Sequence, residues 1–138
     1  MGVSRLLRWQ WEGYARYHQS RVNLLLHILV VPLFLAGNLL LIVALSRGSW
    51  SMGFFSILAM VLSVALQGRG HSKEVVPPEP FTSPLNAVSR IFLEQWVTFP
   101  RFLLSGGWSR ALRHAPAPQS SSAARSSSGS NKAASPPR

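Results

Sequence analysis

Two long apolar segments, separated by a short polar turn, decide what this chain can fold into. Residues 22–45 contain no formal charge over 24 positions, and residues 50–66 form a second apolar run of 17. A 24-residue helix is roughly 36 Å long, enough to cross a bilayer core of about 30 Å. Residues 47–49, Arg-Gly-Ser, predict a tight turn. We therefore expect a hairpin of two membrane-spanning helices.

The charges support this interpretation by their distribution. The chain carries 14 Lys and Arg against four acids, a net charge of +10, while 47% of its residues are apolar. Four cations precede the first run, one lies between the runs, and nine follow the second. This pattern predicts both termini in the cytoplasm. We expect a multi-pass protein of a bacterial inner membrane that contacts membrane lipid and no nucleic acid.

The segments around the hairpin have their own patterns. Residues 1–21 are basic and aromatic, which is typical of an interfacial helix. Residues 85–104 repeat apolar side chains every three or four positions and predict an amphipathic helix interrupted at Pro100, with Ser83 or Asn86 as its cap. Residues 115–138, rich in Ser, Pro and Ala, are expected to be disordered.

The predicted fold is therefore an all-α, small integral membrane helical bundle over residues 1–114: a two-span hairpin with flanking interfacial and amphipathic helices. One alternative is a small soluble domain in which both apolar runs are core helices. It predicts that a carbonate wash extracts the protein from membranes. The sequence sets no oligomeric state.

Histidines are the most informative polar residues, because an ionisable side chain inside a membrane span is costly. Asn23 and His27 are four residues apart and share a helix face, so Asn23 is expected to orient the imidazole. His18 lies nine residues before His27, on the opposite side of any continuous helix. Both reach one site only if the chain breaks between them, and Ser20 is the candidate N-cap. The alternative is a neutral His27 hydrogen-bonded to a neighbouring helix.

By topology, His18 and His71 flank the same end of the hairpin, with Glu74 three residues after His71. Three imidazoles and a carboxylate form a nitrogen and oxygen ligand set that suits iron(II), zinc or manganese. His114 borders the tail and is expected to be solvated. The sequence has no Cys, no Asp and no G-x-S-x-G motif, which excludes thiolate metal sites and argues against hydrolytic triads.

Three motifs follow one another along the chain. The first is an aromatic-His motif, Tyr14, Tyr17 and His18, and the second is Asn23-x-x-x-His27 with the following Pro32. The third is Gly70-His71, followed by Glu74, Pro77 and Pro78. Over roughly residues 8–105, this order resembles a bacterial branch of the Mpo1-like family, formerly a domain of unknown function. The resemblance implies an Fe(2+)-dependent dioxygenase that shortens 2-hydroxy long-chain fatty acids by one carbon. It also implies that His18, His27 and His71 are catalytic iron ligands, with Glu74 ligating or supporting.

Two hypotheses follow. In the first, the acyl chain of a 2-hydroxy fatty acid lies among apolar helices while its carboxylate and hydroxyl reach iron beside O2. Asn23 and Tyr17 support the ligands, and Arg69 or Arg21 pairs with the carboxylate. In the second, the chain is a non-enzymatic membrane protein that binds lipid or assists assembly, and its histidines are structural.

Overall fold

The computed structural model describes residues 2–116, and that part of the chain contains helices and no strands, which confirms the all-α prediction. The expected disorder of residues 115–138 concerns positions that, from 117 on, lie outside the described residues. The elements are α1 (Val3–Tyr14), a 3₁₀ turn η1 (Ala15–Tyr17), α2 (Arg21–Arg47), α3 (Trp50–His71), α4 (Pro84–Leu93), a π-helical turn η2 (Glu94–Thr98), α5 (Phe99–Leu104) and α6 (Gly107–His114).

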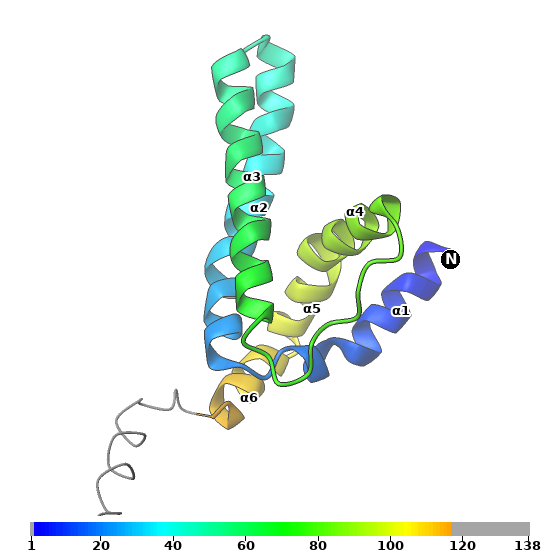
Figure 1. Ribbon diagram of the computed structural model, residues 1–138. Coiled ribbons are helices and arrows are strands. Elements are labelled where there is room, and N and C mark those ends of the chain that lie inside the picture. The colour runs from blue at the N-terminus through cyan, green and yellow to red at the C-terminus, as the bar shows by residue number, and fades with distance from the viewer. Residues whose placement is uncertain (1, 117–138) are drawn as a thin grey trace, which may run out of the picture.

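The apolar runs form the antiparallel pair α2 and α3 (Figure 1). The predicted turn is confirmed: α2 ends at Arg47, and Gly48 adopts the left-handed region with φ +62°. Ser49 then caps α3 by accepting a hydrogen bond from the N–H of Met52. The helix α3 continues five residues beyond the predicted end at Leu66, and this extension carries His71.

Small residues let α2 and α3 approach closely. A Cβ atom on Gly37 would lie 2.8 Å from Cγ of Met60 and 3.0 Å from the carbonyl oxygen of Ser56, so only glycine fits this position. Nearer the open end of the hairpin, the hydroxyl of Ser63 donates to the carbonyl of Val30 at 2.6 Å. The hairpin is thus fixed in register by backbone contact and by a hydrogen bond between its helices.

Helices α1, α5 and α6 gather at the open end of the hairpin, where the chain enters α2 and leaves α3 (Figure 1). The indole N–H of Trp108 in α6 donates to the carbonyl of Leu24 in α2 at 2.9 Å. Five buried side chains form the core of this end: Tyr14, Leu24, Val31, Phe99 and Phe102. This packing closes the open end and leaves the far half of the hairpin projecting alone.

The predicted helix at 85–104 exists as a continuous helical path made of α4, η2 and α5. Ser83 caps it by accepting from the N–H of Asn86 at 3.1 Å, which confirms one of the two candidate caps. Pro100 does not break the path, because it lies in the first turn of α5. The irregularity lies just before it, in the π-helical turn that begins at Glu94.

Both long helices are long and apolar enough to span a membrane. In their most apolar 18-residue stretches, only 28% of the α2 residues and 17% of the α3 residues are buried within the protein. Core helices of a soluble domain bury a whole stripe, so these low shares count against the soluble alternative. The exposed apolar side chains include Leu39, Leu40 and Ile42 on α2, and Phe54, Phe55 and Ile57 on α3.

Candidate metal centre

The chain breaks between His18 and His27, as the histidine spacing requires. The 3₁₀ turn ends at Tyr17, and α2 starts at Arg21 with Ser20 as its N-cap residue. This change of direction brings Nε2 of His18 within 3.4 Å of Nε2 of His27, and both side chains are almost fully buried. The predicted meeting of the two histidines is confirmed, although the Ser20 side chain makes no capping hydrogen bond.

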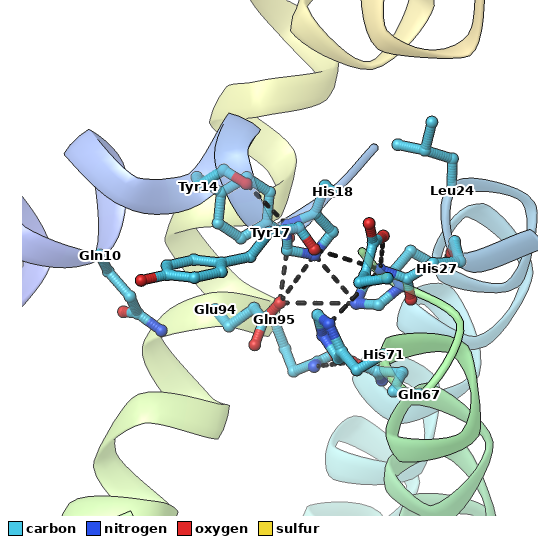
Figure 2. Close-up of polar contacts among 12 residues, drawn as sticks. Gln10, Tyr14, Tyr17, His18, Leu24, His27, Gln67, His71, Glu94 and Gln95 are labelled. Carbon is cyan, nitrogen blue, oxygen red and sulfur yellow. Dashed lines mark hydrogen bonds and ion pairs between the residues drawn. The ribbon is translucent and has the colours of Figure 1, made fainter. Parts of the chain in front are cut away.

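Four side chains converge here, from α2, α3, η2 and the turn that precedes α2 (Figure 2). One potential ligand atom from each of His18, His27, His71 and Glu94 lies within 4.8 Å of the other three. Oε1 of Glu94 is 3.5 Å from Nε2 of His18 and 3.5 Å from Nε2 of His27. The described chain therefore contains a His₃Glu group with the spacing of a metal site.

Backbone carbonyls orient two of the imidazoles. Nδ1 of His18 is 2.8 Å from the carbonyl oxygen of Tyr14, and Nδ1 of His27 is 3.0 Å from the carbonyl oxygen of Asn23. A carbonyl only accepts hydrogen bonds, so each Nδ1 carries the proton and each Nε2 presents its lone pair to the cluster. This is the outer hydrogen bond that metal-binding histidines commonly make.

The three separations among His18, His27 and Glu94 fit a transition metal, and His71 lies within 4.8 Å of these donors. An ion about 2.1 Å from each donor, in tetrahedral or octahedral geometry, separates neighbouring donors by about 3.0–3.5 Å. The His18–His27 and His–Glu94 separations of 3.4 and 3.5 Å lie at the upper end of this range. Three imidazoles and one carboxylate, without sulfur, suit iron(II), zinc or manganese.

Glu94 is held in its charged form although its side chain is only 17% exposed. Burial alone raises its pKa, but hydrogen bonds from His18 and His27 and the positive charge of these imidazoles, when Nε2 carries a proton in place of a bound metal, outweigh burial and hold the pKa of Glu94 well below its usual range. The hydroxyl of Tyr14 also donates to Oε1 of Glu94, at 3.1 Å. Burial, followed by the charge and hydrogen bond of Glu94, raises the pKa of Tyr14, so this phenol remains a donor.

Glu74, which the sequence suggested as the carboxylate of the site, is not a member of the group. Its Oε2 accepts from the backbone N–H groups of Gln19 and Ser20, both at 2.9 Å, and its Oε1 accepts from the side chain of Asn23 at 2.7 Å. The carboxylate thus satisfies free N–H groups at the start of α2, where a negative charge is also favoured. We correct the expected ligand from Glu74 to Glu94.

Asn23 lies beside the cluster as predicted, but its side chain meets His71 and not His27, which contacts only the backbone carbonyl of Asn23. Its side-chain nitrogen lies 3.4 Å from Nδ1 of His71 and 3.5 Å from the carbonyl oxygen of Tyr17. A Cβ on Gly70 would come within 2.5 Å of Oδ1 of Asn23, so this glycine lets α2 and α3 meet beside His71. The Tyr17 side chain points elsewhere, since its hydroxyl donates to Glu79 at 3.3 Å.

A second buried polar group lies beside the cluster. Gln67 of α3 and Gln95 of η2 exchange two amide hydrogen bonds, of 3.1 and 2.6 Å, and Gln67 also donates to the hydroxyl of Ser63. Gln95 directly follows Glu94, so this pair anchors the π-helical turn to α3. Such turns occur frequently at functional sites.

A cavity of about 300 Å³ opens beside the cluster, with His18, His71 and Glu94 in its wall. Arg21 and Arg69, the residues expected to pair with a substrate carboxylate, are not among its lining residues. His114 is exposed, with its Nδ1 2.7 Å from the carbonyl oxygen of Arg110, which agrees with the expected solvated position.

Sequence reasoning missed Glu94 because the residue was assigned to the polar side of an amphipathic helix. One signal was available: Glu94 is the acid that lies within an apolar stretch, Ile-Phe-Leu-Glu-Gln-Trp-Val. The rule applied to His27, that an ionisable group in apolar surroundings needs a reason, applies equally to it. In comparisons with family models, curated proteins and solved structures, nothing matches this chain, so the functional argument depends on the geometry of the site.

Proposed function

We propose that this chain is a membrane-embedded, iron(II)-dependent dioxygenase-like protein that acts on 2-hydroxy long-chain fatty acids, in the manner of α-oxidation. The observation that carries the proposal is the convergence of His18, His27, His71 and Glu94 beside an apolar hairpin, with all of them except His27 in the wall of a cavity. The resemblance to the Mpo1-like family supplies the substrate class.

The donor set fits iron(II), and the four side chains would hold it. Iron would supply O2 binding and electron transfer, which no side chain of the cluster supplies by itself. The protein's part is positioning: the carbonyls of Tyr14 and Asn23 fix two imidazoles, and the hydrogen bond from Tyr14 fixes Glu94. The Gln67–Gln95 pair keeps the π-helical turn, and therefore Glu94, against α3.

The surroundings of the cavity suit an amphiphilic substrate. Apolar side chains, among them Val64 and Ile91, line the cavity together with the polar side chains of the cluster. An acyl chain would contact this apolar lining while its carboxylate and hydroxyl face the histidines. We propose that the hairpin spans the inner membrane with both termini cytoplasmic, since 13 of the 14 cations precede or follow the two apolar runs in the sequence and one, Arg47, lies between them.

The decisive experiment measures metal content and turnover in the same preparations. Detergent-purified protein is expected to contain about one iron per chain and to consume 2-hydroxypalmitate only when O2 is present. His27→Ala is expected to lose both, since loss of even a supporting residue typically costs 10- to 100-fold in metal affinity or activity. His114→Ala is the matched control, because it removes an exposed imidazole outside the cluster.

Two results would contradict the proposal. Equal turnover in wild type and His27→Ala would separate the activity from the cluster. Purified protein without stoichiometric metal, even after iron(II) is added, would favour the non-enzymatic alternative, in which the carbonyl-bonded histidines are structural.

A further inference from the structure

The cavity beside the metal cluster has a cationic residue in its wall, Arg90 of α4. Arg90 and Glu94 are four residues apart in the α4–η2 path, so their side chains leave the same side of the helix about one turn apart. The cavity therefore joins a guanidinium to the His₃Glu cluster.

Two chain segments, α1 and the α3–α4 loop, hold the Arg90 side chain. Its guanidinium carbon lies 4.8 Å from the ring centre of Trp9 in α1 and 4.6 Å from that of Phe81 in the α3–α4 loop. Nη1 also donates to the carbonyl of Pro80 at 3.2 Å. Contacts with two aromatic rings and one carbonyl restrict the guanidinium, whose planar set of N–H donors suits a planar anion.

Arg90 nevertheless forms no direct ion pair within the described residues: burial lowers its pKa, and the nearby charges of Glu94 and Glu79 only oppose that effect. The ion pairs found in residues 2–116 are those of Glu94 with His18 and His27, and no carboxylate of this part lies within 4.0 Å of Arg90. A guanidinium has five N–H donors, and one hydrogen bond to Pro80 uses one of them. A half-buried, oriented cation with free donors is equipped to bind a ligand anion.

A second groove, of about 470 Å³, shares four residues with the inner cavity: Trp9, Glu79, Pro80 and Arg90. Its other lining residues include the polar side chains of Thr82, Ser83, Asn86 and Ser89. Arg90 thus stands where a more polar groove meets a more apolar cavity, the boundary at which the headgroup of an amphiphile is stable.

We propose that Arg90 binds the carboxylate of the acyl substrate and so positions the neighbouring carbon atoms toward the His₃Glu cluster. The identity of the acid depends on the proposed function, whereas the anion site does not. A carboxylate is favoured over a phosphate because Glu94, one turn away, repels a doubly charged headgroup more strongly.

The test measures ligand binding to the full-length protein in detergent, with and without a chelator, by quenching of tryptophan fluorescence. The probes are 2-hydroxypalmitate, its methyl ester and a lysophosphatidate of equal chain length. Arg90→Gln is expected to weaken 2-hydroxypalmitate binding about 10- to 100-fold, to the level of the ester, in both conditions. Binding of the methyl ester should be unchanged.

Arg101→Gln is the matched control, because Arg101 also stacks on a tryptophan, at 3.9 Å from the ring centre of Trp11, but does not line the cavity. It should bind 2-hydroxypalmitate as wild type does. Arg90→Lys keeps the charge without the planar fork and is expected to bind at an intermediate level. Thermal unfolding of each variant checks that the fold is intact, and if Arg90→Gln does not fold, Arg90→Lys decides.

Three results would overturn the inference: unchanged 2-hydroxypalmitate binding in a folded Arg90 variant, an equal loss for the methyl ester, or tighter Arg90-dependent binding of lysophosphatidate. Loss of the Arg90 effect in the presence of chelator would also contradict it. Because the chelated arm contains no iron, a protein that fails to hold iron can still show the Arg90 effect. The anion site and the dioxygenase proposal therefore fail separately.

Discussion

Polar side chains in the two halves of the α2–α3 hairpin, the open half near the cluster and the far half near the Gly48 turn, form hydrogen bonds with different kinds of partner. In the open half, polar groups bond across elements: Ser63 to Val30, Gln67 to Gln95, and Asn23 to Glu74. In the far half, they bond back to their own helix. Asn38 donates to the carbonyl of Phe34, and Ser56 to that of Met52. A helix that satisfies its own polar groups needs no neighbour and can face lipid.

This difference shows that one apolar segment serves two purposes. The open half uses neighbouring helices to bury polar groups that form a site, and exposes apolar side chains such as Leu29 only on its outer face, whereas the far half exposes apolar side chains without such a site. Four substitutions test whether the two halves differ in this way, and they are given in order of decreasing expected effect.

The largest effect is expected from a charge in the far half. Leu40 on α2 is 49% exposed, and Leu40→Arg would place a guanidinium where we propose lipid. A central arginine costs about 2.5–3.5 kcal/mol of insertion free energy. The fraction of protein retained in carbonate-washed membranes should fall sharply, while Leu40→Ala stays near wild type. Retention of Leu40→Arg at the wild-type level would mean that this surface does not face lipid.

The next effect concerns the amide pair of the open half. Gln67→Leu leaves the amide of Gln95 buried without its partner, which costs about 1–3 kcal/mol of unfolding free energy. The double variant Gln67→Leu/Gln95→Leu removes both groups and should recover most of that loss. Denaturant unfolding in detergent measures the unfolding free energy of Gln67→Leu, Gln95→Leu and the double variant. A double variant as unstable as the sum of the singles would show that the two amides are not coupled.

A smaller effect is expected at Gly70, where α3 passes Asn23. Gly70→Ala forces Oδ1 of Asn23 to move from its position 2.5 Å from the new Cβ, and this shift disturbs Asn23 beside His71. We expect metal affinity to fall about tenfold, the lower end of the range for supporting residues. A competitive chelator titration measures it, and an unchanged affinity would show that Asn23 does not support the site.

The smallest effect is expected two residues earlier. A Cβ on Gly68 meets no atom within 4 Å, so Gly68→Ala should fit without strain and stabilise α3 by about 0.5–1 kcal/mol. Its metal affinity should equal that of wild type, which makes it the matched control for Gly70→Ala. A drop in unfolding temperature would indicate that α3 is not regularly helical at this position.

Sequence reasoning predicted the parts of this fold that depend on local pattern. Hydrophobic length predicted α2 and α3, and the nine-residue spacing of His18 and His27 predicted the chain break at Ser20. The choice between Glu74 and Glu94 depends instead on packing. Glu74 is nearer in sequence to His71, but its carboxylate is used at the start of α2. Glu94 reaches the cluster through a π-helical turn that no residue periodicity indicates.

The cluster draws on parts of the chain that are synthesised at different times. His18 lies in the turn before α2, His27 lies in α2 and His71 lies in α3. The pairing of α2 with α3 therefore brings all three imidazoles together. Glu94 follows only after the proline-containing loop and α4. Along the chain the three imidazoles therefore precede the carboxylate, and the packing of the π-helical turn against α3 through Gln67 and Gln95 brings the last member to the group.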